Sequence, residues 1–515
     1  MTELPVIGDN RHLGHRGDGE PESAAGFESR RADDLHLDQR LIPIAHAVHG
    51  FAAQENVAPE LTDSEFSVRR ERNLSSVASC RRLSTGVVVE CEVSTGVPGI
   101  GAVAGGGHAL VLVRVFDEPI GMVSLKVPAT GLTPGELAQD IVDHLEPELH
   151  DRLVQCGVSW AGRLPTGGLH PLCTPYFVAT RERVMRDGPR ITVAVCTRDR
   201  TEDLARLLES LRNQEYPRLA ILVVDNAPSD DRTRRLVDGL TSDLNVRYVT
   251  EPRPGLSWAR NRAIAESDTE VIAWADDDET CDRWWTAELA RAFVEVPGAD
   301  AVTGIVFPGE LETESQVWFE RYSGACRGRG FARHVFSPAT AARQSPLYPL
   351  PPYGAGANMA FRREAIERIG RFDTALGAGT STLAGEDTAA LSALLLAGGT
   401  LVYQPSAIVH HRHRRDYAAL ERVMLGYGRG LSAYYASMIA RRPSCLPELL
   451  RLSRQALRDQ LGRGEGRRDQ LDDFPGELLR LNRKGLLQGA FMYPGARLRA
   501  RRLAGATASG RSQAP

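Results

Sequence analysis

The chain has almost no lysine. Of its 62 basic residues only Lys126 and Lys484 are lysines, and so strong a preference for arginine is more typical of genomic base composition than of a function. The basic residues are balanced by 66 acidic ones, which gives a net charge of −4. This charge gives no reason to expect that the whole chain binds a polyanion.

The cysteines form no pattern. Eight of them are scattered along the chain without a C-x-x-C pair or a regular spacing. This argues against a zinc module and against a disulfide framework, and it is typical of a protein in a reducing compartment.

Long apolar runs are missing as well. The amino terminus has no apolar core behind a basic start, so it does not have the form of a secretory signal. The most apolar window, residues 389–409, is interrupted by Gly398-Gly399 and by Gln404-Pro405. It therefore predicts a buried helix followed by a strand, and not a membrane span. We expect a cytoplasmic protein.

The length and composition predict several domains. A chain of 515 residues is too long for one ordinary core, and 42% hydrophobic with 25% charged residues is typical of a globular protein. Residues 1–80 are polar and aperiodic, and we predict that they are disordered apart from a short helix near residues 41–53.

Residues 85–185 predict a small α/β accessory domain and a linker. Two apolar runs, 109–115 and 120–127, flank the turn residues Asp117-Glu118-Pro119, as in a β-hairpin. Thr133-Pro134-Gly135-Glu136 then has the form of a helix start, and leucine and isoleucine follow at helical spacing. No chemistry follows from this part of the sequence.

Residues 190–435 predict an α/β domain with a mainly parallel sheet. An apolar strand at 191–196 is followed by an amphipathic helix that ends at Tyr216-Pro217, and by a second strand at 219–224. Such a βαβ unit implies a right-handed crossover between parallel strands. Further strands are predicted at residues 246–249 and 271–275.

Three of these strands end in polar or charged residues. They run into Thr197-Arg198, Asp225-Asn226 and the acidic cluster Asp276-Asp277-Asp278. In an open α/β sheet, ligands bind outside the carboxyl ends of the strands, where the strand order reverses. The acidic cluster could instead be a solvated turn, but its convergence with the other two strand ends favours one shared crevice.

The acidic cluster also predicts a divalent metal. Neighbouring carboxylates disfavour one another's ionised form, so a cation should lie nearby. Aspartate oxygens suit Mg²⁺ or Mn²⁺, and magnesium is usually held by one or two carboxylates together with substrate phosphates. No glycine-rich phosphate loop follows the first strand, where residues 197–200 read Thr-Arg-Asp-Arg. We therefore expect metal and arginine to hold a diphosphate.

Seven motifs in register resemble the family 2 glycosyltransferases with the GT-A fold. They are Thr197-Arg198-Asp199-Arg200, Asp225-Asn226, Gly255 to Asn261, Asp276-Asp277-Asp278, Asn358 to Phe361, Gly385-Glu386-Asp387 and His410. The resemblance covers residues 190–430. It implies a Rossmann-like, mainly parallel sheet and an inverting transfer of sugar from a nucleoside-diphosphate sugar, most often a UDP-sugar, to an acceptor hydroxyl. The acceptor would be a glycan or a lipid- or peptide-linked group.

The resemblance also implies roles for particular residues. The nucleotide-sugar site would contain Thr197, Arg198, Asp225, Arg260, Asn261, Asp276, Asn358 and Glu386, with Asp225 on the base. The metal, Mn²⁺ or Mg²⁺, would be held by Asp278, by Asp276 and by His410. His411 and His413 are alternatives to His410 because they lie so close in the sequence.

The resemblance makes Asp387 the general base that takes the proton from the acceptor hydroxyl. The sequence places Glu386-Asp387 at the start of a helix that ends at Gly398-Gly399. An acid in the first turn also stabilises the helix dipole, so capping is the alternative interpretation, and the two roles are compatible.

Residues 316–330 predict a mobile acceptor loop. Gln316, Trp318, Phe319 and Glu320 precede a glycine-rich stretch, which is typical of loops that close over a donor. The alternative is that Trp318 packs in the core.

Residues 436–515 predict a helical, arginine-rich extension. Between residues 412 and 511 there are 21 basic residues against 9 acidic ones, and residues 496–503 are basic with a partly helical pattern. Such a tail could contact an anionic membrane at its cytoplasmic face, or it could be solvated. Nothing in the pattern indicates nucleic-acid binding. The other functional class that stays open is a non-catalytic nucleotide-sugar-binding or scaffold protein of a polysaccharide or glycoconjugate pathway.

Overall fold

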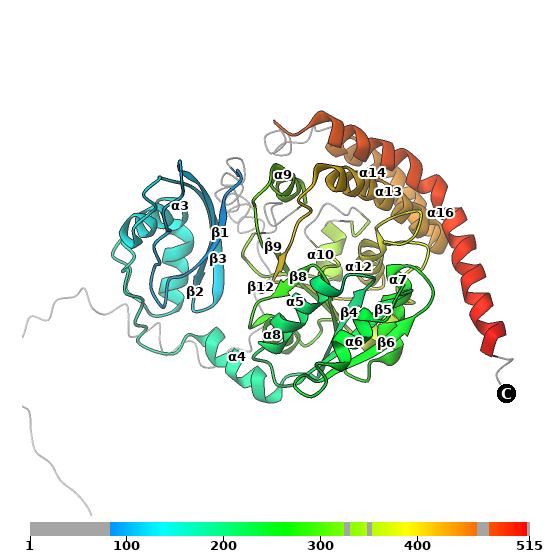
Figure 1. The fold of residues 1–515 in the computed structure, drawn as a ribbon, viewed down its shortest axis with the longest axis horizontal. Coiled ribbons are helices and arrows are strands. Elements are labelled where there is room, and N and C mark those ends of the chain that lie inside the picture. The colour runs from blue at the N-terminus through cyan, green and yellow to red at the C-terminus, as the bar shows by residue number, and fades with distance from the viewer. Residues whose placement is uncertain (1–82, 324–329, 344, 348–352, 461–472, 512–515) are drawn as a thin grey trace, which may run out of the picture. The chain divides into compact units, whose positions relative to one another are not determined.

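A computed structural model of the chain describes residues 83–323, 330–343, 345–347, 353–460 and 473–511 (Figure 1). The disorder predicted for residues 1–80, the helix near 41–53 and most of the glycine-rich part of the acceptor loop lie outside these residues.

The larger part of the structure is built on a nine-stranded sheet. Its strands are β4 (Ile191–Thr197), β5 (Leu219–Asn226), β6 (Val246–Glu251), β7 (Val271–Asp276), β8 (Glu279–Cys281), β9 (Ala301–Pro308), β10 (His334–Phe336), β11 (Asn358–Arg362) and β12 (Leu401–His411). The order is β10-β12-β9-β11-β7-β4-β5-β6, with β8 also paired to β12. The four strands predicted between residues 191 and 275 are all present.

The strand directions place a topological switch beside β4. The strands β7, β4, β5 and β6 are parallel to one another, as are β9 and β12, whereas β8, β10 and β11 run antiparallel to the strands they pair with. The chain moves outward from β4 to β6 and then returns to β7 on the other side of β4. Strand order therefore reverses between β4 and β7, at the kind of position where open α/β sheets bind ligands.

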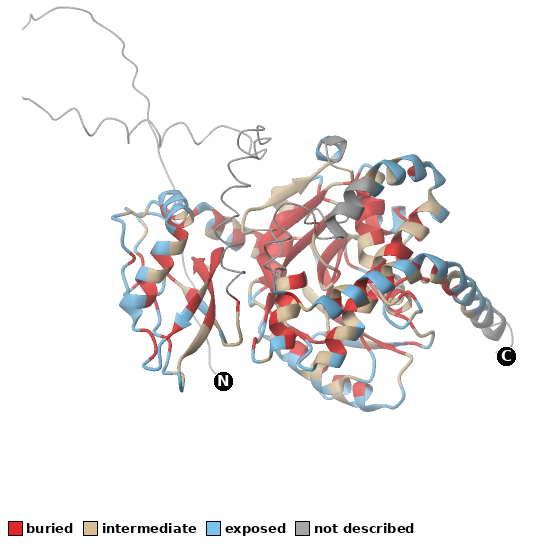
Figure 2. Cartoon of the chain, turned by 90° about the horizontal axis from the view of Figure 1, so that it is seen from above, coloured by how far each residue is buried: buried red, intermediate tan, exposed pale blue. Residues whose placement is uncertain are grey.

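Helices cover both faces of this sheet. One face carries α4 (Tyr176–Asp187), α5 (Thr201–Arg212), α6 (Arg232–Asp238) and α8 (Trp285–Glu295). The other carries α7 (Leu256–Glu266), α11 (Arg363–Arg368), α12 (Glu386–Leu396) and α13 (Tyr417–Arg441). Figure 2 shows the strands between these layers as mostly buried.

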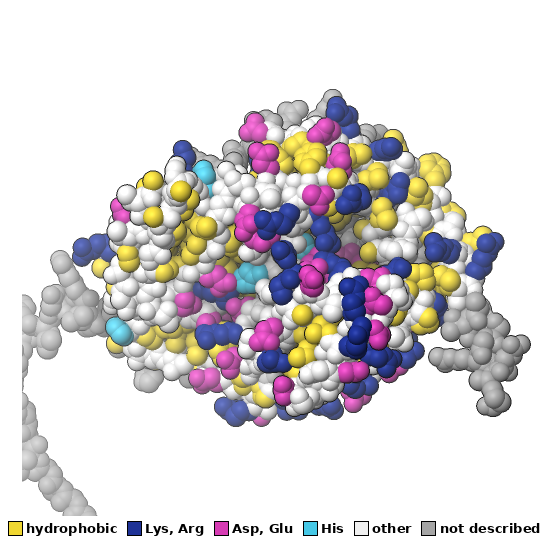
Figure 3. Space-filling model, viewed as in Figure 1, with side chains coloured by type: hydrophobic (Ala, Val, Ile, Leu, Met, Phe, Trp, Pro, Cys, Tyr) yellow, Lys and Arg dark blue, Asp and Glu magenta, His cyan; other side chains and the backbone are white. Residues whose placement is uncertain are grey.

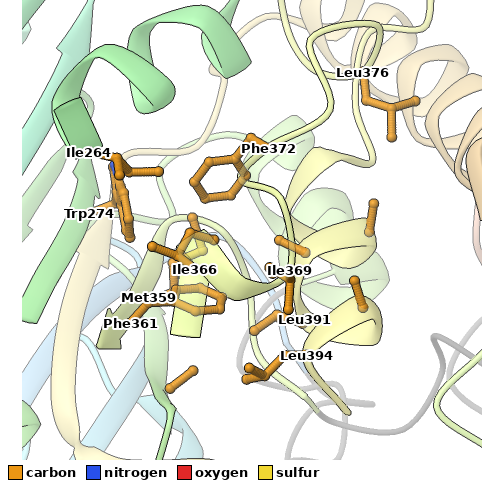
Figure 4. Close-up of a cluster of buried hydrophobic side chains, with 14 of the residues drawn as sticks. Ile264, Trp274, Met359, Phe361, Ile366, Ile369, Phe372, Leu376, Leu391 and Leu394 are labelled. Atoms are coloured by element: carbon orange, nitrogen blue, oxygen red, sulfur yellow. The ribbon is translucent and has the colours of Figure 1, made fainter. Parts of the chain in front are cut away.

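Alternate residues of each strand serve the two layers. Ile272 and Trp274 of β7 point to the α12 side, whereas Val271 and Ala273 point to the α8 side. On the α12 side the ring of Trp274 meets Phe361 and Phe372 edge to face, with centroids 6.1 and 5.3 Å apart (Figure 4). The apolar core thus fixes the strand that ends in the acidic cluster.

A separate three-stranded sheet precedes the large one. It contains β1 (Val87–Glu92), β2 (Gly107–Val115) and β3 (Glu118–Val127), and the predicted hairpin is the antiparallel pair β2 and β3. The helix α3 (Pro134–Gln155) begins at Thr133, whose hydroxyl accepts from the Glu136 N–H while the Glu136 carboxylate accepts from the Thr133 N–H. The division into an accessory domain stays a prediction.

Both faces of this small sheet are buried. Val111 and Val113 pack with α3, whereas Leu110, Leu112 and Met122 pack with side chains of β9 and β12. Buried ion pairs accompany the second contact. They join Arg291 of α8 to Glu118 of β3 at 2.6 Å and Arg114 of β2 to Asp282 at 2.8 Å. Because a buried charge that loses its partner is costly, these pairs specify how the small sheet docks on the large one.

The carboxyl-terminal part is helical, as expected. It contains α13, the short 3₁₀ helix η1 (Pro443–Cys445), α14 (Leu446–Gln460) and α16 (Gly476–Arg511). Glycine lets α13 and α16 approach closely, because a Cβ on Gly428 would lie 2.0 Å from the Asn482 carbonyl oxygen. None of the described helices has an apolar stretch that would reach across a bilayer.

The segments α9 (Glu314–Ser323) and α10 (Pro338–Arg343) complete the described elements. Trp318 of α9 meets Phe474 edge to face at 5.6 Å, and the Arg321 guanidinium lies 4.9 Å from its ring. The interpretation of Trp318 as a packed side chain therefore fits the structure better than that of a free platform.

Candidate functional site at the carboxyl ends of β4, β5 and β7

The polar strand ends lie side by side. Thr197 at the end of β4 is the register partner of Asp225 on β5, and its neighbour Cys196 is the partner of Asp276 on β7. The sheet thus brings together three of the motifs that the sequence predicted to share one crevice.

Two of the clustered aspartates share Arg200 as a partner. Asp277 accepts hydrogen bonds from the Thr197 hydroxyl at 2.8 Å and from Arg200 at 2.5 Å. Asp278 lies 3.1 Å from both Arg200 and Arg414. Figure 3 shows arginine, acidic and histidine side chains gathered near the middle of one face.

The two aspartates differ in their ionisation. Burial raises the pKa of Asp277 to about 7. The pKa of Asp278 lies well below its usual range, because His411, Arg200 and Arg414 outweigh the opposing effect of burial. Asp278 is therefore the carboxylate that stays charged, as a metal ligand must.

A buried arginine organises the next group of acids. One nitrogen of Arg260 lies 2.9 Å from Glu386, and the other lies 3.5 Å from Asp276 and 3.1 Å from the Gly356 carbonyl oxygen. Burial and then the neighbouring Asp387 raise the pKa of Glu386 to about 7. Burial also raises the pKa of Asp276. The site holds more acid than its arginines can neutralise.

Asp387 lies beside this arginine in the first turn of α12. One of its carboxylate oxygens accepts from the Gly356 N–H at 2.8 Å, and the other accepts from the Thr388 N–H at 2.6 Å. A Cβ on Gly356 would lie 2.7 Å from the Asp387 Cβ, so only glycine allows this approach. The side chain is partly exposed and held in one orientation.

Asp225 is fully buried and keeps an unused acceptor. Its Oδ2 accepts from the Tyr248 hydroxyl at 2.8 Å, whereas no partner for Oδ1 is found among the described residues. Burial raises the pKa of this carboxyl. An unpaired buried acceptor is costly, and a ligand that donates a hydrogen bond would remove this cost.

Two predicted asparagines have both polar atoms of their side chains bonded within the protein. Asn358 is buried in the sheet, where its amide bonds the Ile305 and Ala407 carbonyl oxygens and the Trp285 ring N–H. Both polar atoms of the Asn261 side chain bond the backbone of Phe372. These two asparagines position the surrounding backbone, while Arg198 is exposed and lies 3.7 Å from Asp199.

The sequence analysis named His410 first as the histidine that binds the metal, but the structure turns His410 away from the crevice. His410 faces Glu90 of the small sheet, with Nε2 2.7 Å from the carboxylate. His411 faces the crevice, and its Nε2 lies 3.4 Å from Asp278 Oδ1. Side chains alternate along β12, so the adjacent residue points to the opposite side. His411, which the sequence offered as an alternative, takes the place of His410.

Sequence reasoning gave no role to Arg200, Arg414 or Tyr248. Arg200 stands within the quoted Thr-Arg-Asp-Arg motif, and Arg414 belongs to the basic run after His410. Nothing in the sequence pairs Tyr248 with Asp225, because the contact depends on the register of β5 and β6.

The residues fit a divalent cation only in part. Among the residues that the structure describes, no three His, Cys, Asp or Glu side chains are grouped to hold a metal by themselves. Asp278 Oδ1 and His411 Nε2 nevertheless lie close enough to bind the same ion. This donor set suits an ion that completes its coordination with phosphate oxygens and water.

The raised pKa of Glu386 predicts a pH dependence of stability. Its folded-state pKa of about 7 exceeds the ordinary value of 4.5, so the folded state loses stability as pH rises from about 4.5 through about 7. Glu386→Gln should lose less stability across this window than the parent. Urea unfolding of the metal-free proteins at pH values from 4.5 to 8 measures the free energy of unfolding of the parent and of Glu386→Gln. The exposed Glu364→Gln is the matched control, and equal slopes in the parent and Glu386→Gln would contradict the assignment.

Comparisons with known proteins point to one family of enzymes. The profile of "Glycosyl transferase family 2" matches residues 192–370. The chain is 32% identical to the succinoglycan biosynthesis protein ExoM of Rhizobium meliloti over 236 residues, which are 45% of this chain and 69% of that protein. It is 26% identical to the pre-mycofactocin glycosyltransferase of Mycobacterium tuberculosis over 343 residues, 66% of this chain and 61% of that protein.

Among solved structures, the chain resembles a mannosyltransferase of Pyrobaculum calidifontis in complex with GDP-Man and Mn²⁺. The identity is 19% and the TM-score 0.37, over 65% of this chain and 86% of that one, which is too low to support a further conclusion. The family match, the 32% relative and the mainly parallel sheet confirm the predicted family, enzyme class and fold. The chain belongs to glycosyltransferase family 2 and is a glycosyltransferase with an α/β fold of the GT-A type.

Proposed function

We propose that the chain is a metal-dependent, inverting glycosyltransferase that moves sugar from a nucleoside-diphosphate sugar, with a UDP-sugar as the expected donor, to an acceptor hydroxyl. The observation that carries this proposal is that Asp225 and Asp276 flank the end of β4 on its two neighbouring strands, while Arg260 lies beside both Asp276 and Glu386, the neighbour of Asp387. Such sites bind nucleotides in other open α/β sheets.

The donor's base would lie against Asp225. The unused Oδ1 acceptor suits a base that offers a ring N–H, as uracil does. Thr197 and Arg198 would lie at the edge of the nucleotide, and Arg200 and Arg414 are close enough to Asp278 to attract a diphosphate. These contacts would orient the donor and hold its charge.

A divalent ion would be held by Asp278 and His411, with Asp276 nearby. Bound there, Mn²⁺ or Mg²⁺ would supply a positive charge that stabilises the departing diphosphate. The excess of acid around Arg260 supports the expectation that a cation belongs at this site.

Asp387 would act as the general base. Its carboxylate takes the proton of the acceptor hydroxyl, the hydroxyl oxygen attacks the anomeric carbon, and the bond from that carbon to the diphosphate breaks with inversion. The N–H groups of Gly356 and Thr388 hold the carboxylate for this step. A positioned base typically contributes about 10²- to 10⁴-fold to the rate.

The acceptor class is less narrowly defined. One relative's name describes succinoglycan biosynthesis, and another, from Haloferax volcanii, is a glucosyl-dolichyl phosphate glucuronosyltransferase that is 24% identical over 229 residues. These names favour a glycan or a lipid-linked sugar. A binding or scaffold protein without catalysis is the alternative, and the presence of Asp387 together with the acidic cluster argues against it.

A panel of nucleotide sugars with Mn²⁺ or Mg²⁺ tests the donor site without an acceptor. We expect one donor to raise the melting temperature and to be hydrolysed slowly, because a ligand that binds only the folded state stabilises it. Thermal shift and nucleotide release are the measurements. If no nucleotide sugar stabilises the protein with either metal, the proposed donor site is wrong.

Two substitutions separate catalysis from metal binding. Asp387→Asn should lower transfer by about 10²-fold or more while nucleotide affinity stays near that of the parent. Asp278→Ala should weaken nucleotide binding only when metal is present. Turnover and calorimetry with and without Mn²⁺ measure both effects, and the exposed Asp268→Asn is the control. Parent turnover in Asp387→Asn would remove this residue from the mechanism.

We also propose that α16 contacts an anionic membrane. Its exposed face carries Leu487, Phe491 and Leu498, at spacings of four and seven residues, and Phe491 is 88% exposed. Basic side chains lie exposed at both ends of this apolar strip, namely Arg480, Arg483, Lys484, Arg499, Arg501 and Arg502. Within the described residues none of these six forms an ion pair with an acidic side chain. This combination is typical of interfacial helices.

Vesicle sedimentation tests the membrane contact. The protein should bind vesicles with anionic lipid more tightly than vesicles of phosphatidylcholine alone, and added salt should weaken this binding. Phe491→Glu should lower the affinity about tenfold or more, whereas Leu172→Glu, on an exposed residue outside α16, should not. Equal binding to both kinds of vesicle, or none, would contradict the proposal.

A further inference from the structure

The loop 371–385, which joins α11 to α12, leads directly to the proposed general base. Gly385 is the N-cap of α12, and Asp387 follows in the first turn. Near each end the loop contains a residue that is not glycine and has a left-handed backbone, Arg371 with a φ of 62° and Leu383 with a φ of 69°. Such a backbone is strained and persists only where the surrounding structure holds it. The contacts of this loop therefore also position the start of α12.

Helix α7 holds the first half of the loop. The side-chain amide of Asn261 donates to the Phe372 carbonyl oxygen and accepts from the Phe372 N–H. The Ser257 hydroxyl donates to the Leu376 carbonyl oxygen at 2.8 Å. These contacts fix the backbone on both sides of Asp373, whose side chain has other partners.

Helices α13 and α16 contact the same part of the loop through Asp373. Its Oδ2 accepts from the Ser437 hydroxyl of α13 at 2.6 Å and from the Tyr493 hydroxyl of α16 at 2.8 Å. Its Oδ1 accepts from the Ala375 N–H at 3.0 Å. Tyr493 is buried, and burial raises its pKa to about 12, so the hydroxyl keeps its proton and donates. One carboxylate thus connects the loop to both of these helices.

The loop in turn lies against the start of α12. The Thr382 hydroxyl donates to the Ala375 carbonyl oxygen at 2.9 Å, which joins the second half of the loop to the first. A Cβ on Gly377 would lie 3.0 Å from a carboxylate oxygen of Glu386, so the loop backbone packs directly on this side chain. Because a packed interior transmits strain, a shift of the loop would also move the neighbouring Asp387.

We propose that Tyr493 and Asp373 are positioning residues for the general base. The Tyr493 hydroxyl holds the Asp373 carboxylate, and the loop held in this way keeps Asp387 in place at the start of α12. The proposal rests on the role of Asp387 proposed above. Tyr493 and Asp373 act on the reaction only through the loop. Helix α16, for which the sequence suggested only a membrane contact or a solvated tail, thereby takes part in the arrangement of the site.

Tyr493→Phe tests the proposal, because it keeps the ring and removes the hydroxyl. The measured reaction is hydrolysis of the UDP-sugar that the panel selects, in which water takes the place of the acceptor hydroxyl. At saturating donor it should be about 3- to 10-fold slower, the effect of one lost hydrogen bond. The affinity for UDP with Mn²⁺, measured by calorimetry, should stay at the parent value. Ser437→Ala, which removes the other hydroxyl at the same oxygen, should act in the same direction.

Hydrogen exchange measures the position of the loop without any turnover. In Tyr493→Phe the backbone amides of residues 373–385 should exchange about 3- to 10-fold faster than in the parent, because one contact that closes the loop is lost. The amides of β5 should exchange at the parent rate. Unchanged protection of the loop amides in both Tyr493→Phe and Ser437→Ala would contradict the proposal.

The matched control is Tyr216→Phe. It removes a buried hydroxyl from its hydrogen bond with the Pro189 carbonyl oxygen, on the α5 side of the sheet, so hydrolysis and loop exchange should stay at the parent values. An equal loss of hydrolysis in Tyr216→Phe, or a loss of UDP affinity in Tyr493→Phe as large as the loss of hydrolysis, would show a general effect on the fold and overturn the proposal.

Asp387→Asn separates this proposal from the one on which it rests. If Asp387→Asn hydrolyses the donor at the parent rate, the role of Asp387 as the base is wrong, and the positioning role fails with it. If Asp387→Asn loses hydrolysis while Tyr493→Phe and Ser437→Ala keep the parent rate, the base stands and the positioning role is wrong.

Discussion

The site depends on an excess of buried acid at the end of β7. Arg200, Arg260 and Arg414 form ion pairs with four of these acids, Asp276, Asp277, Asp278 and Glu386, and Glu279 and Asp387 add two further carboxyl groups. Burial raises the pKa of Asp276, Asp277 and Glu386, and it raises the pKa of Glu279 well above its ordinary value. Asp278, where several basic groups converge, is the exception. The basic groups around it, His411, Arg200 and Arg414, therefore decide which carboxylate stays ionised.

A glycine and the packing of apolar side chains keep these charged groups in place. Gly356 allows its backbone to lie against Asp387, and Arg260 bridges the Gly356 carbonyl, Glu386 and Asp276. On the apolar side, Trp274 packs edge to face on Phe372 just before the acidic cluster. A buried polar network of this kind is rigid when its members are paired, so a base and a metal ligand can keep their separation.

The small sheet and α9 reach the same region from other parts of the chain. Glu90 of β1 lies against His410, Asp278 after β7 against His411, and Glu320 of α9 against His413, so these three histidines have partners from three different parts of the chain. Contacts from separate elements restrict each imidazole to one role. The end of β12 and the residues that follow it thus hold side chains of the site in place.

The sequence by itself determined the α/β class, the strands at 191–275 and the residues at their ends, because apolar runs and the polar residues after them are local patterns. It also determined that Asp387 opens a helix. Only the tertiary structure decided that His411 and not His410 faces Asp278, that Asn358 serves the sheet, and that Tyr248 and Glu320 support Asp225 and His413. Side-chain direction along β12 and contacts between elements that lie about 20 to 90 residues apart depend on register and packing, which no local pattern encodes.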